Sequence, residues 1–401
     1  MGRRLTLLLA LTCGVSVSTI YFPQAITPLI ASSLNVSPAT AALVATAAQL
    51  GYAVGIFFLV PLGDRLPHRR LIITLLALTG LGLLIAGSAP ALPLLVTASA
   101  LIGVVTVVPQ IIIPMAAGLV SDDRRGATTG TLLSGLIGGI LLARTFSGTV
   151  GAWLGWRAPY LIAAALILLL AAVLGASIPA TTPNTREPYR SLLTASLRLL
   201  RTEPELRRSS LYQATLFGGF SAAWTSLALL ITGPTYDLGP QTVGLIALVG
   251  AASMFCTPVA GRWIDRRGPD VVNLVCILGV IASAVLLLPG TIGGAPGLVI
   301  LAAGMLLMDI AVQSSQVANQ SRIFALNPNA RSRLNTAYMT CSFLGGSAGS
   351  YLGVRAYTAF GWHGVCALLA LTAAIALARH LFHRAAAKDK THDLPSHAAI
   401  R

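Results

Sequence analysis

The chain has 401 residues, of which 55% are hydrophobic and only 10% are charged. Soluble proteins carry roughly a quarter of charged residues, so this composition excludes a disordered chain and an ordinary soluble globule. The formal net charge is +15, from 27 Lys and Arg against 12 Asp and Glu. The basic residues stand in short gaps between long apolar runs, which indicates a membrane protein and does not favour nucleic-acid binding.

Apolar segments long enough to cross a bilayer, which takes roughly 20 residues, follow one another along the whole chain. We predict twelve spans, at residues 5–31, 40–62, 71–89, 92–119, 127–150, 158–177, 209–232, 242–261, 271–288, 297–324, 334–360 and 364–382. The first run is longer than the apolar core of a signal peptide, so we expect it to remain as the first span. The expected fold class is an all-α membrane protein.

The basic residues also predict the orientation of the spans. All but three of them fall on one side if the spans alternate, and the exceptions are Arg144, Arg157 and Arg355. The opposite loops, at 32–39, 90–91, 233–241 and 289–296, contain no Lys or Arg. Because cytoplasmic loops carry the excess of basic residues, we expect both termini in the cytoplasm of a bacterium and the spans in its inner membrane.

The longest gap between spans, residues 178–208, predicts the division into domains. We expect a six-helix bundle at 1–177, a cytoplasmic central loop at 178–208, a second six-helix bundle at 209–383 and a cytoplasmic tail at 384–401. Within the loop, leucines recur at helical spacing, at Leu192, Leu193, Leu197 and Leu200. This spacing predicts an amphipathic helix that lies on the inner leaflet.

The two halves repeat one another. A short hairpin with the dipeptide Asp-Arg follows the second span and again the eighth. Pairs of similar residues keep a nearly constant separation along the chain: Asp64 with Asp265, Gln110 with Gln316, and Gly155-Trp156 with Gly361-Trp362. Such a series indicates a parallel duplication, in which a cytoplasmic hairpin occupies the same place in each half.

This arrangement resembles the major facilitator superfamily, whose members have twelve spans, a long central loop and an Asp-Arg hairpin in each half. The family pattern is roughly G-x-L-A-D-R-x-G-R-R. Here Val60–Arg70 reads V-P-L-G-D-R-L-P-H-R-R, and Gly261–Asp270 reads G-R-W-I-D-R-R-G-P-D. The resemblance covers the whole chain and is closest in character to bacterial drug and metabolite efflux proteins. It implies two pseudo-symmetric six-helix bundles and a monomeric secondary transporter, not an enzyme, that works by alternating access.

Two departures separate the chain from typical drug:proton antiporters of that family. The fourth span contains no charged residue, although an arginine is typical there. The fifth-span pattern G-x-x-x-G-P-x-x-G-G is degenerate, because Leu136 stands at the position of the proline. Neither departure argues against transport.

Asp309 is the only acid within a predicted span. It lies about 12 residues into the tenth span, hence roughly 18 Å deep at 1.5 Å per residue. A carboxylate at that depth costs several kcal/mol unless it is paired, hydrated or protonated, and intramembrane acids are functional candidates by default. We therefore predict that Asp309 carries a coupled proton. The alternative is a structural acid that Arg144 or nearby amides hold in place.

The resemblance implies that the first, fourth, seventh and tenth spans line a central cavity. Their aromatic and amide side chains are then candidate substrate ligands: Tyr21, Gln24, Gln110, Gln213, Phe217, Phe220, Trp224, Gln313, Gln316 and Asn319. A mixed aromatic and amide pocket suits small amphipathic molecules. For each aromatic residue taken alone, ordinary helix packing is the alternative.

Other charged residues are candidates for anion binding and for gating. Arg144, in the outer half of the fifth span, either binds an anionic group in the cavity or anchors the helix structurally. The hairpin residues Asp64, Arg65, Arg69, Arg70, Asp265 and Arg266 are candidate gating residues. By the resemblance, both aspartates face the other half and latch an outward-open state.

The remaining patterns predict packing and not chemistry. Glycine runs at Gly135, Gly138 and Gly139, and at Gly345, Gly346, Gly349 and Gly353, permit close helix approach, which we expect where the halves meet. The five cysteines lie in apolar segments without a CxxC motif, so we expect no metal site. The chain has no motif of ATP-driven transport or hydrolysis, and we expect no cofactor.

These observations favour proton-linked export of a small organic compound that is drug-like, sugar-like or a metabolite. One alternative is an importer or facilitator of a small organic anion that uses Arg144. Another is a membrane sensor that does not transport. The expected partners are the substrate, protons and the lipid bilayer, and no nucleic acid.

Overall fold

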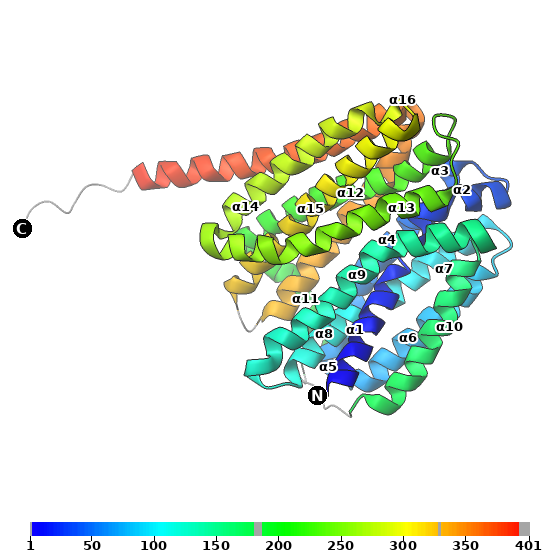
Figure 1. The fold of residues 1–401 in the computed structure, drawn as a ribbon. Coiled ribbons are helices and arrows are strands. Elements are labelled where there is room, and N and C mark those ends of the chain that lie inside the picture. The colour runs from blue at the N-terminus through cyan, green and yellow to red at the C-terminus, as the bar shows by residue number, and fades with distance from the viewer. Residues whose placement is uncertain (1, 180–186, 328–329, 393–401) are drawn as a thin grey trace, which may run out of the picture.

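The computed structural model describes residues 2–179, 187–327 and 330–392, and this part of the chain contains helices and no strand. Figure 1 shows the two halves packed side by side. The helices of the first half are α1 (Arg3–Ser18), α2 (Phe22–Ser33), α3 (Pro38–Ala41), α4 (Leu43–Leu59), α5 (Leu62–Arg65), α6 (His68–Gly87), α7 (Leu92–Val105), α8 (Val108–Gly118), α9 (Asp122–Leu154) and α10 (Ala158–Ser177).

A short connecting helix, α11 (Tyr189–Thr202), precedes the second half. The elements of that half are α12 (Pro204–Thr232), α13 (Pro240–Gly250), the 3-10 helix η1 (Ala251–Cys256), α14 (Thr257–Leu287), the 3-10 helix η2 (Leu288–Thr291), α15 (Gly294–Leu326) and α16 (Arg331–His392). The predicted helix of the central loop therefore exists as α11. Residues 180–186 of that loop and 393–401 of the predicted tail lie outside the described residues, and the domain boundaries stay a prediction.

Ten helical segments of the described chain are long and apolar enough to cross a membrane. Two of these segments, α14 and α16, each contain a turn that separates two predicted spans. A non-helical Gly268, at φ 78°, interrupts α14 between the predicted eighth and ninth spans. Gly361, at φ 63°, separates the eleventh and twelfth spans within α16. Because residues with a side chain rarely adopt such φ values, the chain turns where glycine stands, and the expected all-α architecture of two six-span bundles is confirmed.

Five of the seven glycines in the two runs pack helices within one half, so the expectation that they lie where the halves meet was wrong for these. It holds for Gly346, where an added Cβ would lie 2.8 Å from the side chain of Gln49 in the other half. A Cβ atom at Gly139 of α9 would lie 2.2 Å from the carbonyl oxygen of Gly14 in α1. In the second half, a Cβ at Gly349 of α16 would lie 1.9 Å from the carbonyl oxygen of Gly218 in α12. The backbones of these helix pairs touch, which only glycine allows.

Hydrogen bonds join the two halves in the middle and outer parts of the predicted spans. Thr145 of α9 donates a hydrogen bond to the carbonyl oxygen of Gly244 in α13, at 2.8 Å. Ser347 of α16 donates to the carbonyl oxygen of Thr46 in α4, at 3.1 Å. These pairs close the outer side of the interface between the halves.

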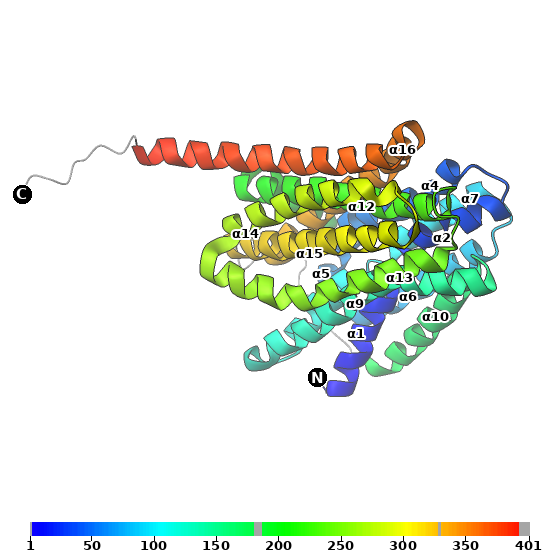
Figure 2. The same cartoon turned by 45° about the horizontal axis from the view of Figure 1, so that its top comes forward.

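The start of α1 and the far end of α16 lie on the side of the molecule away from α2 and α3, as both views show (Figures 1 and 2). On that side, α11 and the residues just before it contact both halves. Tyr189 donates a hydrogen bond to the carbonyl oxygen of Phe58, at 2.5 Å, and Glu187 forms an ion pair of 3.1 Å with Arg333.

Candidate substrate and coupling site

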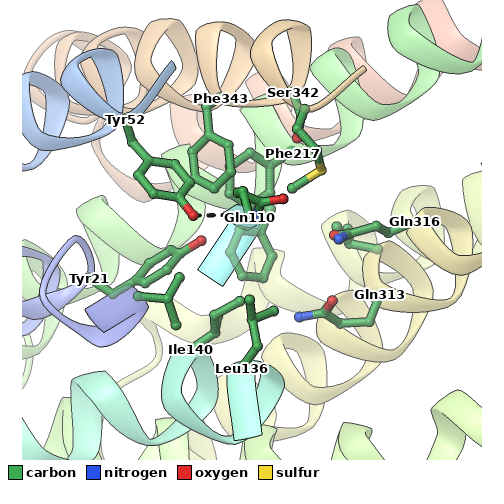
Figure 3. A pocket seen from close by; sticks show the side chains of 14 residues that line it. Tyr21, Tyr52, Gln110, Leu136, Ile140, Phe217, Gln313, Gln316, Ser342 and Phe343 are labelled. Atoms are coloured by element: carbon green, nitrogen blue, oxygen red, sulfur yellow. Dashed lines mark hydrogen bonds between the residues drawn. The ribbon is translucent and has the colours of Figure 1, made fainter. Parts of the chain in front are cut away.

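A cavity lies between the two halves, and Figure 3 shows it from close by. Its empty volume, part of which opens to solvent, is about 490 Å³. Five aromatic residues, three glutamines and six other residues line it: Tyr21, Tyr52, Phe217, Phe220 and Phe343; Gln110, Gln313 and Gln316; and Val17, Leu136, Ile140, Val312, Met339 and Ser342. None of these side chains is a carboxylic acid or a basic group.

The aromatic side of the cavity is one connected set of rings. Phe217 stacks on Phe220 with centroids 5.4 Å apart and an interplanar angle of 16°. Phe343 meets Phe217 edge to face at 5.2 Å, and it meets Tyr52 at 4.5 Å. Edge-to-face and stacked pairs are the favourable arrangements of aromatic rings. Helices of both halves thus build a single ring wall.

The amide side chains of the cavity come from α8 and α15, and they differ in how many of their hydrogen-bonding atoms already have a protein partner. Gln110 donates to the hydroxyl of Tyr52 at 3.4 Å and accepts from Asn335 at 3.3 Å. The Oε1 atom of Gln316 accepts from Gln213, at 3.3 Å, while its own N–H groups make no hydrogen bond to a described residue. Gln313 points into the cavity (Figure 3).

A second cluster, fully buried, holds the one acid of the predicted spans, Asp309, together with Arg144. Asp309 of α15 is 0% exposed and Arg144 of α9 is 1% exposed. The indole N–H of Trp224 donates to Asp309 Oδ1 at 3.0 Å, and the Arg144 guanidinium lies 4.3 Å from the Trp224 ring centroid. Trp224 therefore contacts both charges, one through its N–H and one through its face.

The charges of this cluster are incompletely paired. Arg144 Nε donates to Gln24 at 2.7 Å, but Arg144 Nη2 and Asp309 Oδ2 have no hydrogen-bond partner among the described residues. Asp309 Oδ2 is instead directed at Gly250, where an added Cβ would lie only 2.3 Å away. Gly250 ends α13 immediately before the 3-10 helix η1, so the helix of the eighth span changes its geometry beside the carboxylate.

The cavity and the charge cluster share a wall. The rings of Tyr21 and Phe220 line the cavity and also lie 5.0 and 5.3 Å from the Arg144 guanidinium. Asp309 stands four residues, about one helical turn, before Gln313 on α15. A molecule in the cavity therefore touches side chains that contact the charge cluster directly.

The structure gathers six of the predicted substrate ligands around the cavity: Tyr21, Gln110, Phe217, Phe220, Gln313 and Gln316. Gln24, Arg144 and Trp224 belong to the charge cluster behind it, and Gln213 supports Gln316. Asn319 does not reach the cavity, because it exchanges hydrogen bonds of 3.1 and 3.2 Å with Asn273 of α14.

Sequence reasoning missed several lining residues. Tyr52 and Phe343 lie on the second and eleventh spans, which the resemblance did not assign to the cavity. Their signal was weak, because one aromatic residue in an apolar helix has the pattern of ordinary packing. Only the contact between Tyr52 and Phe343, which joins the two halves, distinguishes them.

The predicted gating residues occupy unequal positions. Asp64 is half-buried and interacts electrostatically with Arg333 of the other half. Asp265 is exposed and pairs with no described residue. Arg65, Arg70 and Arg266 are exposed, and Arg69 donates to the carbonyl oxygen of Gly175 within its own half.

A further charge cluster, which the sequence did not predict, lies at the inner end of the second half. Asp270 pairs with Arg208, at 3.0 Å, and with Arg322. Glu205 pairs with Arg208 and lies 3.6 Å from Arg322. Both arginine side chains are at most 6% exposed, and we call these four residues the inner cluster.

Comparison with known proteins agrees with this architecture. The family model of the Major Facilitator Superfamily matches residues 7–350, and the chain belongs to that family. Uncharacterized transporter YgaY of Escherichia coli O157:H7 is 36% identical over 366 residues, which cover 91% of this chain and 92% of that protein. The chloramphenicol resistance protein of Streptomyces lividans is 28% identical, over 68% of this chain and 69% of its own.

The fold also matches a solved structure. A bacterial homolog to the human lysosomal transporter Spinster, in an inward-facing and occupied conformation, superimposes with a TM-score of 0.71 at 15% identity and 98% coverage of both chains. Together with the family, this fold identifies the chain as a multi-pass membrane transporter of small molecules, not an enzyme.

Proposed function

We propose that this chain exports a small organic compound from the bacterial cytoplasm in exchange for protons, by alternating access. The observation that carries the proposal is Asp309. It is the only acid of the predicted spans, it is completely buried, one of its oxygens lacks a partner, and it lies one helical turn from the lining of a cavity between the halves.

An acid in this position has two states of unequal cost. The ionised carboxylate must be stabilised by Trp224 and by Arg144, which makes no hydrogen bond to it. A proton removes the charge and with it the cost of burial. Because Tyr21 and Phe220 line the cavity and contact Arg144, substrate binding changes the surroundings of Arg144, which supports coupling between substrate and the buried charges.

The outer contacts of the halves support alternating access. The bonds from Thr145 to Gly244 and from Ser347 to Thr46 join opposite halves near the outer ends of their helices. Each holds one neutral hydrogen bond, worth about 1 kcal/mol net. Separation of the halves at these points would break both bonds and open the cavity outward.

The distribution of basic residues supports a cytoplasmic location of the N-terminus and of the inner cluster. One further observation supports export. A relative is named for resistance to chloramphenicol, which is the expected phenotype of an exporter. The rival, import of an organic anion on Arg144, fits the geometry less well, since rings cover Arg144 and it does not line the cavity.

Proteoliposomes test this proposal. We would screen neutral, cationic and anionic compounds, chloramphenicol included, for substrate-induced proton flux, and then compare wild type with Asp309→Asn, which mimics the protonated acid. The variant should exchange substrate down its gradient and fail to concentrate it when only a pH difference is applied. Asp265→Asn, at an exposed acid, is the matched control and should keep pH-driven transport. Full pH-driven transport in Asp309→Asn would refute proton coupling at this residue.

A further inference from the structure

We infer that the cavity takes an uncharged, planar aromatic molecule with a hydrogen-bond donor and acceptor on adjacent atoms, such as the edge of a primary amide or a lactam. This inference rests on the proposed function only in taking the cavity as the substrate site. It follows from three properties of the lining: the absence of ionised groups, the connected ring wall, and the free amide of Gln313.

An anion has no counter-charge in the cavity. The fourteen lining residues contain no basic side chain. Arg144 is the closest candidate, but Tyr21 and Phe220 cover it on the cavity side, and its Nε already donates to Gln24. A carboxylate in the cavity would therefore lose its hydration without a direct ionic partner, which is unfavourable.

A cation is disfavoured although aromatic rings usually attract cations. The faces of Tyr21 and Phe220 already interact with the Arg144 guanidinium, at 5.0 and 5.3 Å. A second cation on the cavity side of these rings would meet a like charge across a medium of low dielectric constant. Asp309 does not line the cavity, so no ionised acid contacts a molecule there to offset this repulsion.

A planar ring fits the aromatic wall. Phe217 and Phe220 are stacked and nearly parallel, and Phe343 presents its edge to Phe217. Tyr52 extends this wall across the interface between the halves. Planar aromatic molecules add to such arrays by stacking and by edge contacts.

The polar contacts of the ligand come from α15. Gln313 makes no hydrogen bond to a described residue, so its carbonyl and its NH₂ group are both available, and in Figure 3 it faces the two tyrosines. Gln316 still offers its N–H groups. A side-chain amide presents its donor and acceptor on neighbouring atoms, and its complement is a ligand edge with one acceptor and one donor side by side.

A matched series of naphthalene derivatives tests the inference by binding alone. With purified protein in detergent, we would titrate 2-naphthamide, N,N-dimethyl-2-naphthamide, 2-naphthoate and 2-naphthylmethylammonium, and subtract their partition into empty micelles. The four compounds share one ring system and differ in charge and in the amide N–H. The readout is the dissociation constant, with the shift in unfolding temperature as a second measure.

We expect 2-naphthamide to bind about tenfold more tightly than either charged compound, because a charge without a partner costs more on burial. It should bind severalfold more tightly than its dimethyl derivative, which lacks the donor. Equal or tighter binding of the naphthoate or of the ammonium compound would overturn the inference. So would undetectable binding of 2-naphthamide at its solubility limit.

Two variants of α15 test whether Gln313 is the residue that binds the amide group of the ligand. Gln313→Leu should remove the preference for 2-naphthamide over its dimethyl derivative and leave ring binding in place. Gln320→Leu, the same change farther along the helix at a residue that does not line the cavity, should keep that preference. An unchanged preference in Gln313→Leu would exclude Gln313 as the ligand.

Failure of this inference is separable from failure of the proposed function. The binding assay involves no gradient and no proton transfer. If the order of affinities holds while Asp309→Asn keeps pH-driven transport, the proton coupling is wrong and the substrate class stands. If a charged compound binds best and Asp309→Asn loses pH-driven transport, the reverse is true.

Discussion

The molecule holds two charge clusters with buried arginines, and the clusters differ in how their charges are paired. In the inner cluster, Asp270 and Glu205 contact Arg208 and Arg322 directly. In the cluster between the halves, Trp224 contacts both Arg144 and Asp309, and each of these charges keeps one atom without a hydrogen bond.

The difference teaches which cluster is structural. Direct ion pairs within one half stabilise one arrangement of three helices and have no reason to change during a transport cycle. The other cluster joins helices of both halves, and Arg144 and Asp309 form no direct ion pair with each other, which leaves its free energy sensitive to a proton or to a neighbouring ligand. The same residue types thus serve stability in one place and coupling in the other.

The largest expected effect is a difference in stability between variants of the two clusters. Asp270→Asn removes a carboxylate from two buried arginines, and we expect the free energy of unfolding to fall by roughly 2 kcal/mol. This is less than the roughly 3–5 kcal/mol expected for a fully buried pair, because Asp270 is half exposed. Asp309→Asn should leave the unfolding temperature nearly unchanged. The measurement is thermal unfolding in detergent, and an equal loss in both variants would favour a structural role for Asp309.

A smaller effect is expected from crowding the carboxylate. Gly250→Ala places a methyl group 2.3 Å from the present position of Asp309 Oδ2, so the carboxylate must rotate away from Trp224. Overpacking costs typically 1–3 kcal/mol, and we expect pH-driven transport to fall about tenfold with protein yield preserved. Gly138→Ala, where an added Cβ meets no atom within 4 Å, is the control. Normal transport in Gly250→Ala would show that the carboxylate position is unimportant.

A still smaller effect is expected from removing only the hydrogen bond between the Trp224 indole N–H and Asp309. Trp224→Phe keeps a ring against Arg144 and deletes the hydrogen bond to Asp309, and we expect a severalfold loss of transport, in line with one hydrogen bond to a charged group. Trp156→Phe is the matched control, because the buried Trp156 N–H has no partner. Equal rates in both variants would argue that Trp224 serves only packing.

The smallest expected effect concerns the hairpins. Asp64→Ala removes the electrostatic interaction with Arg333 across the halves and should shift the ensemble modestly towards inward-open states. Asp265→Ala should shift it less, since Asp265 is exposed. Distances between spin labels at the cytoplasmic helix ends measure both. The same distance distribution in Asp64→Ala and wild type would contradict the prediction that Asp64 latches the outward-open state.

Much of the fold was predictable because it depends on local properties of the chain. Span length and the placement of basic residues follow from the bilayer, which forces backbone groups to pair within helices. The turn at Gly361 coincides with the second copy of the Gly-Trp pair. The importance of Asp309 was also predictable, since a single acid in an apolar segment is conspicuous without any knowledge of its neighbours.

Tertiary structure alone decided which side chains meet. Asn319 shares a helix with Gln313 and Gln316, yet it faces Asn273 because of how α14 packs on α15. The hairpin acid that pairs with buried arginines is Asp270 and not the motif residue Asp265. Trp224 contacts both buried charges because α12, α9 and α15 converge. Helical periodicity fixes the face that a residue occupies, whereas its partner depends on the rotation and separation of neighbouring helices, which no single segment encodes.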